Sequence, residues 1–72
     1  MALDTTLSIR LNGEPRSIAP GTSVDALVRQ LGLRPEVVAV ELEERLVARD
    51  RRASTILRDG DRVEIVTLVG GG

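Results

Sequence analysis

Hydrophobic and polar residues alternate along residues 7–11, a period of two that predicts a strand with one buried face. Asn12-Gly13 follows, and this pair favours the positive φ angles of a two-residue hairpin turn. The chain is therefore expected to return as a second strand over residues 15–19, with Leu7 facing Ile18. The proline that begins this strand cannot donate a ladder hydrogen bond, so the strand is expected at an edge of the sheet.

A different period, with apolar residues at i, i+3, i+4 and i+7, predicts a helix after the sequence Pro-Gly-Thr. The apolar stripe consists of Val24, Leu27, Val28 and Leu31. Thr22 is the predicted N-cap, because its hydroxyl can accept a hydrogen bond from the first turn, and Gly32 is the predicted stop. A helix of about nine or ten residues is marginal by itself, so it is expected to pack against the sheet.

Alternation resumes at residues 38–43, which predicts a third strand, and a short fourth strand is expected at residues 46–48. Residues 49–58 show no clean period and are expected to form a loop with one helical turn. Asp59-Gly60-Asp61 predicts a tight turn, because glycine accepts the backbone angles that such turns require. Residues 62–69 then form the last predicted strand.

This order of elements, two strands, a helix, two strands, a loop and a final strand, predicts one α+β domain. A mixed sheet of four to five strands would carry one main helix on one face, with its first and last strands parallel in the centre. This arrangement is the β-grasp (ubiquitin-like) fold. Residues 1–69 are assigned to the domain, and residues 70–72, all glycine, to a flexible C-terminal tail.

Composition limits the chemistry that this chain can perform by itself. Its 72 residues include no cysteine, histidine or aromatic residue, and all 10 basic residues are arginine. A disulfide scaffold and a Cys/His zinc site are therefore excluded, and no lysine is available for a Schiff base. The serine and threonine hydroxyls lack an activating histidine or lysine, and one Asp-Gly-Asp turn supplies too few oxygens for calcium. We therefore expect no catalytic residues, no bound cofactor and no metal site.

Charge and hydropathy narrow the set of partners. The 10 basic residues nearly balance 11 acidic ones, so no positive excess favours phosphates, and no aromatic ring is present to stack on bases. No apolar stretch approaches the ~20 residues of a membrane span. The N-terminal residues lack the basic start and apolar core of a signal peptide. The protein is expected to be cytoplasmic and monomeric when free, without nucleic-acid or membrane partners.

The last predicted strand indicates where a partner would bind. If Val63 and Ile65 face the helix, then Val66 and Leu68 point to the opposite face, just before the glycines. Apolar residues on an uncovered face are typical of a partner-binding site. The alternative is a central strand that is buried on both faces. The sequence leaves both interpretations open.

Three stretches of the chain together resemble one protein family. They are TSVDALVRQLGL, VAVELEERLVAR and ILRDGDRVEIVTLVGGG. The pattern resembles the sulfur-carrier proteins of thiamine biosynthesis, the ThiS type, over nearly the whole chain, and the C-terminal stretch is its most specific part. The chain also departs from the family pattern in four places. Glu43-Glu44-Arg45 stands where an asparagine-centred turn is frequent, Ala48 and Ile56 stand at frequent proline positions, and Arg52 stands where an aromatic residue is common.

The resemblance implies that this protein is a co-substrate of other enzymes. An E1-like adenylating enzyme (ThiF-like) would use ATP to activate the carboxylate of Gly72, and a persulfide sulfur donor would convert it to a thiocarboxylate. Thiazole synthase (ThiG-like) would then accept the sulfur. Gly70 and Gly71 would thread into the partner's active site, which their lack of a Cβ permits. The expected partner-binding residues are Val66, Leu68, Val69 and Arg49.

Other interpretations share the fold. The small subunit of molybdopterin synthase has the same tail chemistry but usually carries prolines before its glycines, and residues 66–69 contain none. A carrier for another sulfur metabolite, a ubiquitin-like modifier joined through Gly72 to partner lysines, and an interaction module with an idle tail remain open. Arg49 matches a family arginine, and the alternative for it is a solvated surface side chain.

Overall fold

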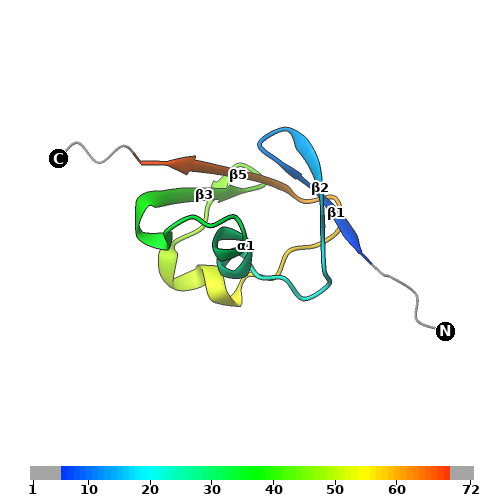
Figure 1. The fold of residues 1–72 in the computed structure, drawn as a ribbon, viewed down its shortest axis with the longest axis horizontal. Helices are drawn as coiled ribbons and strands as arrows, with labels where there is room; N and C mark the ends of the chain where they lie inside the picture. The colour runs from blue at the N-terminus through cyan, green and yellow to red at the C-terminus, as the bar shows by residue number, and fades with distance from the viewer. Residues whose placement is uncertain (1–5, 69–72) are drawn as a thin grey trace.

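The computed structural model describes residues 6–68 and shows a five-stranded mixed sheet with one α-helix on one face (Figure 1). The strands are β1 (Leu7–Leu11), β2 (Glu14–Ile18), β3 (Val38–Leu42), β4 (Arg45–Leu46) and β5 (Arg62–Thr67). The helical elements are α1 (Val24–Gln30) and the short 3-10 helices η1 (Pro35–Val37) and η2 (Arg49–Ser54). The predicted α+β class is confirmed.

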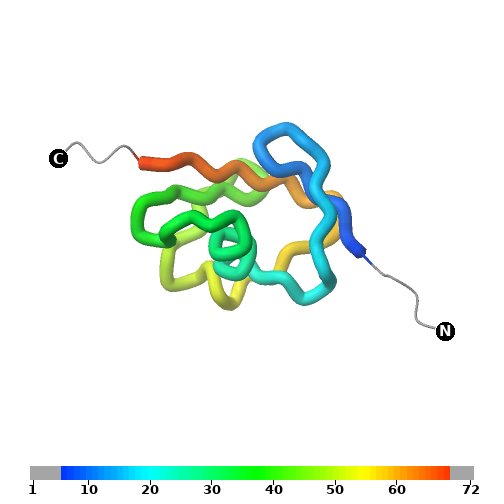
Figure 2. Tube along the Cα trace, in the orientation of Figure 1, coloured from blue at the N-terminus to red at the C-terminus, as the bar shows by residue number. Residues whose placement is uncertain are grey.

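The strands lie in the order β2-β1-β5-β3-β4, which places β5 in the centre. β1 and β5 are parallel, and the other neighbouring strands are antiparallel. Figure 2 shows the blue N-terminal hairpin next to the orange C-terminal strand, although these segments are far apart in the sequence. The predicted parallel pairing of the first and last strands is therefore confirmed.

The first hairpin has the predicted register, with Leu7 opposite Ile18. Both turn residues have positive φ angles, as a two-residue turn requires. The Asn12 side chain also ties the hairpin to the central strand, because its Nδ2 donates to the Ile65 carbonyl and its Oδ1 accepts from the Ile65 N–H. β2 begins one residue earlier than predicted and lies at the sheet edge, where the missing N–H of Pro15 breaks no ladder bond.

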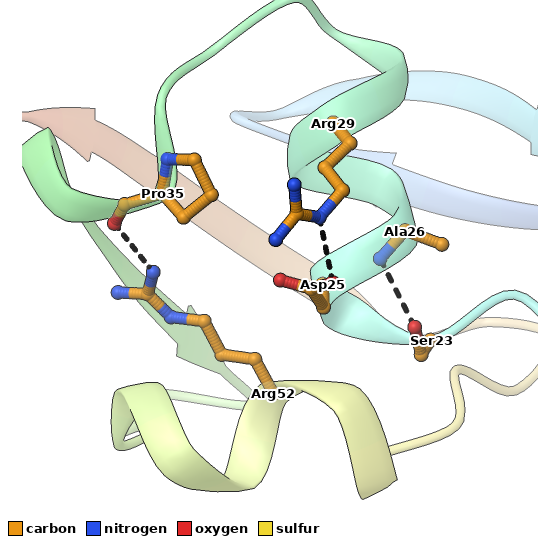
Figure 3. Close-up of polar contacts among 6 residues, drawn as sticks. All are labelled: Ser23, Asp25, Ala26, Arg29, Pro35 and Arg52. Carbon is orange, nitrogen blue, oxygen red and sulfur yellow. Dashed lines mark hydrogen bonds and ion pairs between the residues drawn. The ribbon is translucent and has the colours of Figure 1, made fainter.

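The helix α1 begins one residue later than predicted. Ser23, not Thr22, is the N-cap, and its Oγ accepts a hydrogen bond of 3.0 Å from the Ala26 N–H (Figure 3). Thr22 is buried, and its hydroxyl donates to the carbonyl of Ala19 at 2.6 Å instead. The helix has 7 residues rather than nine or ten. Gly32, with a φ of +75°, ends it as predicted.

One aliphatic core lies between α1 and the sheet. Its buried members are Ile9, Ile18, Val24, Leu27, Val28, Val38, Val40, Val47, Leu57, Val63 and Ile65. The predicted helical stripe is confirmed, because three of its residues are fully buried and Leu31 packs against the core. None of the helices within residues 6–68 is long and apolar enough to cross a membrane.

The C-terminal half differs from the prediction mainly at element ends. The turn between β3 and β4 is made by Glu43 and Glu44, with φ angles of 51° and 69°, and β4 covers only two residues. The predicted helical turn in the following loop is present as η2. β5 ends at Thr67 rather than at Val69, and Val69 lies outside the described residues together with the glycine tail.

Candidate functional site

The side chains of β5 divide between the two faces of the sheet. Val63 and Ile65 are 1% and 7% exposed and belong to the core, whereas Val66 and Leu68 are 56% and 52% exposed. The predicted sidedness is therefore confirmed, and the alternative of a strand buried on both faces is wrong. The role of the two exposed residues in partner binding stays a prediction.

We call the sheet surface opposite α1 the open face. Near the end of β5 it is apolar, because Ala39 lies directly opposite Val66 and Leu68 follows on the same side. Leu46 on β4, 70% exposed, adds to this face through its pairing with Glu41. Exposed apolar residues that gather on one face are typical of a protein-binding surface.

The charges of the open face lie in separate rows. Glu41 and Glu64 are directly opposite each other on β3 and β5, an arrangement of like charges that weakens strand pairing. Neither carboxylate takes part in the ion pairs found within residues 6–68. The next row toward the start of β5 holds Arg10 beside Arg62. The open face thus changes from apolar to acidic to basic with distance from the end of β5.

The end of β5 is tied to β3 up to the last described residue. Thr67 is paired with Val38, and the Leu68 N–H donates to the Val37 carbonyl at 2.7 Å. The fold therefore positions Leu68 four residues before Gly72. The predictions for residues 69–72 and for the boundary between domain and tail lie outside the described residues.

Arg49 is the first residue of η2, and it is exposed. Since η2 packs against α1, Arg49 belongs to the layer on the helix side of the sheet (Figure 1). The structure thus brings Val66 and Leu68 together on the open face and does not bring Arg49 to it. A contact between Arg49 and a partner stays a prediction.

Arg52 is a residue whose position the sequence patterns did not predict. It is 3% exposed, and its two terminal nitrogens donate to the carbonyls of Pro35 and Val38, each at 2.8 Å (Figure 3 shows the first of these bonds). A charged residue in a segment without hydrophobic period gave no reason to expect burial. The one available signal was that Arg52 occupies a position where the family commonly has an aromatic residue, since such a position is typically buried.

The Glu43 side chain closes the β3–β4 turn onto β5. Its Oε2 accepts a hydrogen bond of 2.6 Å from the Arg62 N–H, and its Oε1 lies 3.3 Å from the Arg62 guanidinium. The backbone hydrogen bond from Arg62 is the main reason that the pKa of Glu43 is lowered from its ordinary value. The charged carboxylate therefore stabilises a turn whose two residues both adopt unfavourable positive φ angles.

The strand order, the parallel pairing of the first and last strands, and the single α-helix across one face define a β-grasp protein of the ubiquitin-like type. Within this class, the sequence model of the ThiS family matches residues 9–72. The chain belongs to the ThiS family.

Individual relatives agree with this assignment. The chain is 39% identical over 66 residues to a thiazole synthase of Magnetococcus marinus. The matched stretch covers 92% of this chain but only 20% of that protein. It is 39% identical to the sulfur carrier protein ThiS of Thermus thermophilus, covering 86% of this chain and 95% of that one. The crystal structure of a thiamine biosynthesis protein (ThiS) from Geobacter metallireducens superposes with a TM-score of 0.79 at 32% identity, covering 92% of this chain and 100% of that one.

Proposed function

We propose that this protein is a sulfur carrier in thiamine biosynthesis and that the carboxylate of Gly72 carries the sulfur. The observation that carries the proposal is the course of β5. Its inner side chains are buried in the core, while Val66 and Leu68 are exposed on the open face, and only Val69 separates Leu68 from the glycines. Membership of the ThiS family, whose model match extends to Gly72, supports the same conclusion.

The proposed chemistry uses the chain only as a co-substrate. The Gly72 carboxylate attacks the α-phosphate of ATP on an E1-like enzyme, pyrophosphate leaves, and an acyl-adenylate forms. The terminal sulfur of a persulfide then attacks the acyl carbon, and AMP leaves. A second thiol cleaves the resulting sulfur–sulfur bond, which releases a Gly72 thiocarboxylate and a disulfide. Glycine suits both attacks, because no side chain crowds the carbonyl.

Docking on the adenylating enzyme is assigned to the apolar part of the open face. Val66 and Leu68 retain about half of their surface for a partner, and they lie at the point from which the tail leaves the sheet. Val69, the next residue, is included in the proposed contact, and Gly70 and Gly71 are proposed to thread into the active site. Arg49 is proposed to contact acidic groups of a partner from the helix side of the fold.

Thiazole synthase is the proposed acceptor of the sulfur. The support comes from the relative in Magnetococcus marinus, where a sequence similar to this chain forms 20% of a protein that is itself named thiazole synthase. Such a protein would join carrier and acceptor in one chain. For this chain, we propose that the carrier acts in the cytoplasm and is monomeric when free.

The proposal is tested by release of pyrophosphate. The purified protein is incubated with ATP and its cognate adenylating enzyme, and release is expected only when the carrier is present. Deletion of Gly72 should abolish release without changing the urea midpoint, because no residue of the described core is altered. Absence of release, with an enzyme shown to be active on another carrier, contradicts the proposal. Stable adducts with lysines of other proteins would favour a ubiquitin-like modifier instead.

A further inference from the structure

Arg52 is the one charged residue that is buried within residues 6–68. Its guanidinium donates to the Pro35 and Val38 carbonyls, while its Nε is buried and finds no acceptor in the described part of the chain. Placing a cation out of water is unfavourable unless its donors are used. The two hydrogen bonds to backbone carbonyls therefore account for the stability of this side chain inside the fold.

The bond to the Val38 carbonyl completes the part of the β3 edge that has no strand beside it. β4 pairs only with the last two residues of β3, and the next bond along this edge runs from the Val47 N–H to the Val40 carbonyl at 2.8 Å. Carbonyls two residues apart in a strand point to the same edge, so the Val38 carbonyl faces this edge beyond the reach of β4. Arg52 supplies from its side chain the donor that a longer β4 would supply from its backbone.

The opposite edge of the same short segment holds the end of β5. Val37 lies between the two residues that Arg52 binds, and its carbonyl accepts the hydrogen bond from the Leu68 N–H. Arg52 thus binds one edge of the segment at residues 35–38, and Leu68 is bonded to the opposite edge of the same segment.

We propose that Arg52 is a positioning residue that fixes the point at which the chain leaves the sheet toward Gly72. Its anchoring role stands on the contacts alone, and its effect on activation of the carboxylate rests on the proposed function. The residues after Leu68 span at most about 14 Å, so a shift of the exit point moves the carboxylate directly. If the bond from Leu68 opens, one more residue must be ordered before reaction, which lowers the productive population by about 5- to 30-fold.

The anchoring role is tested by amide hydrogen exchange on the full chain. In Arg52→Met, the exchange rate of the Leu68 amide is expected to rise at least about tenfold more than that of the Val47 amide. The Val47 amide is the reference because it is bonded to the Val40 carbonyl on β3, to which Arg52 donates no hydrogen bond. Arg52→Lys, which keeps the charge and one donor group, should give an intermediate change. Arg51→Met is the matched control, because the exposed Arg51 side chain makes no hydrogen bond within residues 6–68.

An equal rise at both amides, or no rise, overturns the anchoring role. If Arg52→Met does not fold, the same comparison in Arg52→Lys decides between these outcomes.

The catalytic consequence is tested by the kinetics of pyrophosphate release, measured with ATP and a persulfide donor present so that the acyl-adenylate is consumed and the enzyme turns over. Val66 stays paired with Ala39 on β3, and only Leu68 is loosened, so Arg52→Met should lower kcat about tenfold and raise the KM for the carrier by no more than about fivefold. Partial recovery of kcat is expected in Arg52→Lys. A raised KM with unchanged kcat contradicts the positioning role. If the wild-type protein itself releases no pyrophosphate, the proposed function fails, while the exchange comparison still judges the anchoring role.

Discussion

Replacing Val66 and Leu68 together by serine should weaken binding to the adenylating enzyme without unfolding the protein. Complete burial of a valine or leucine side chain contributes about 1.5–3 kcal/mol. The two residues are 56% and 52% exposed, so each has about half of this free energy, or about 1 kcal/mol, still to gain from a partner. The double variant should therefore lose about 2 kcal/mol of binding free energy, which corresponds to about a 30-fold rise in KM.

The assay is pyrophosphate release as a function of carrier concentration, with a persulfide donor present to consume the acyl-adenylate, combined with urea denaturation of the same variant. The free energy of unfolding should change by no more than about 1 kcal/mol, because both side chains lie outside the core. Ile56→Ser is the matched control, since Ile56 is 49% exposed but lies beside Ser23 at the start of α1. A change in KM of less than about threefold, or an equal rise in KM for Ile56→Ser, contradicts docking through Val66 and Leu68.

Three further predictions concern the fold. Leu27→Ala removes a fully buried side chain and should lower the free energy of unfolding by about 2–5 kcal/mol. The total expected for a domain of this size is roughly 4–11 kcal/mol, so the urea midpoint should fall clearly. Glu44→Gly should raise the free energy of unfolding by up to about 1 kcal/mol, because Glu44 has a φ of 69°; a lower midpoint contradicts the turn geometry. Since the pKa of Glu43 is lowered in the fold, its charged form stabilises the protein above the pKa of the unfolded chain, and this contribution is lost as pH falls through the folded pKa. Over that acidic range the wild-type protein should lose more stability than Glu43→Gln, and equal losses would contradict the role of the bond from Arg62.

The N-terminal half was predictable because its signals are local. Asn12-Gly13 sets the hairpin register, and the helical spacing sets the buried face of α1. The N-cap was wrong by one residue because two adjacent hydroxyls compete. Ser23 faces the helix, whereas the hydroxyl of Thr22 turns back to the preceding loop. Sequence alone does not say which of the two neighbours adopts the capping geometry.

The C-terminal half contains features that depend on partners distant in the sequence. The turn at Glu43 and Glu44 lacks glycine and asparagine, and its positive φ angles are supported by the contact of Glu43 with Arg62. Arg52 is buried because the Pro35 carbonyl in η1 and the Val38 carbonyl at the unpaired edge of β3 accept its hydrogen bonds, and these acceptors come together only when the fold is assembled. In contrast, the two-residue period was enough to place Val66 and Leu68 on the face of β5 opposite the helix. It left open whether that face is covered, and the structure shows both side chains exposed.

If Gly72 carries sulfur as a thiocarboxylate, the sulfur changes the intact mass of the protein. The protein is incubated with ATP, a persulfide donor and its adenylating enzyme, and then fragmented in the mass spectrometer. Replacement of one oxygen by sulfur is expected in the C-terminal fragment that ends at Gly72, and it should be absent without ATP. An unchanged mass, with an enzyme active on another carrier, or sulfur located elsewhere in the chain, would contradict a thiocarboxylate at Gly72.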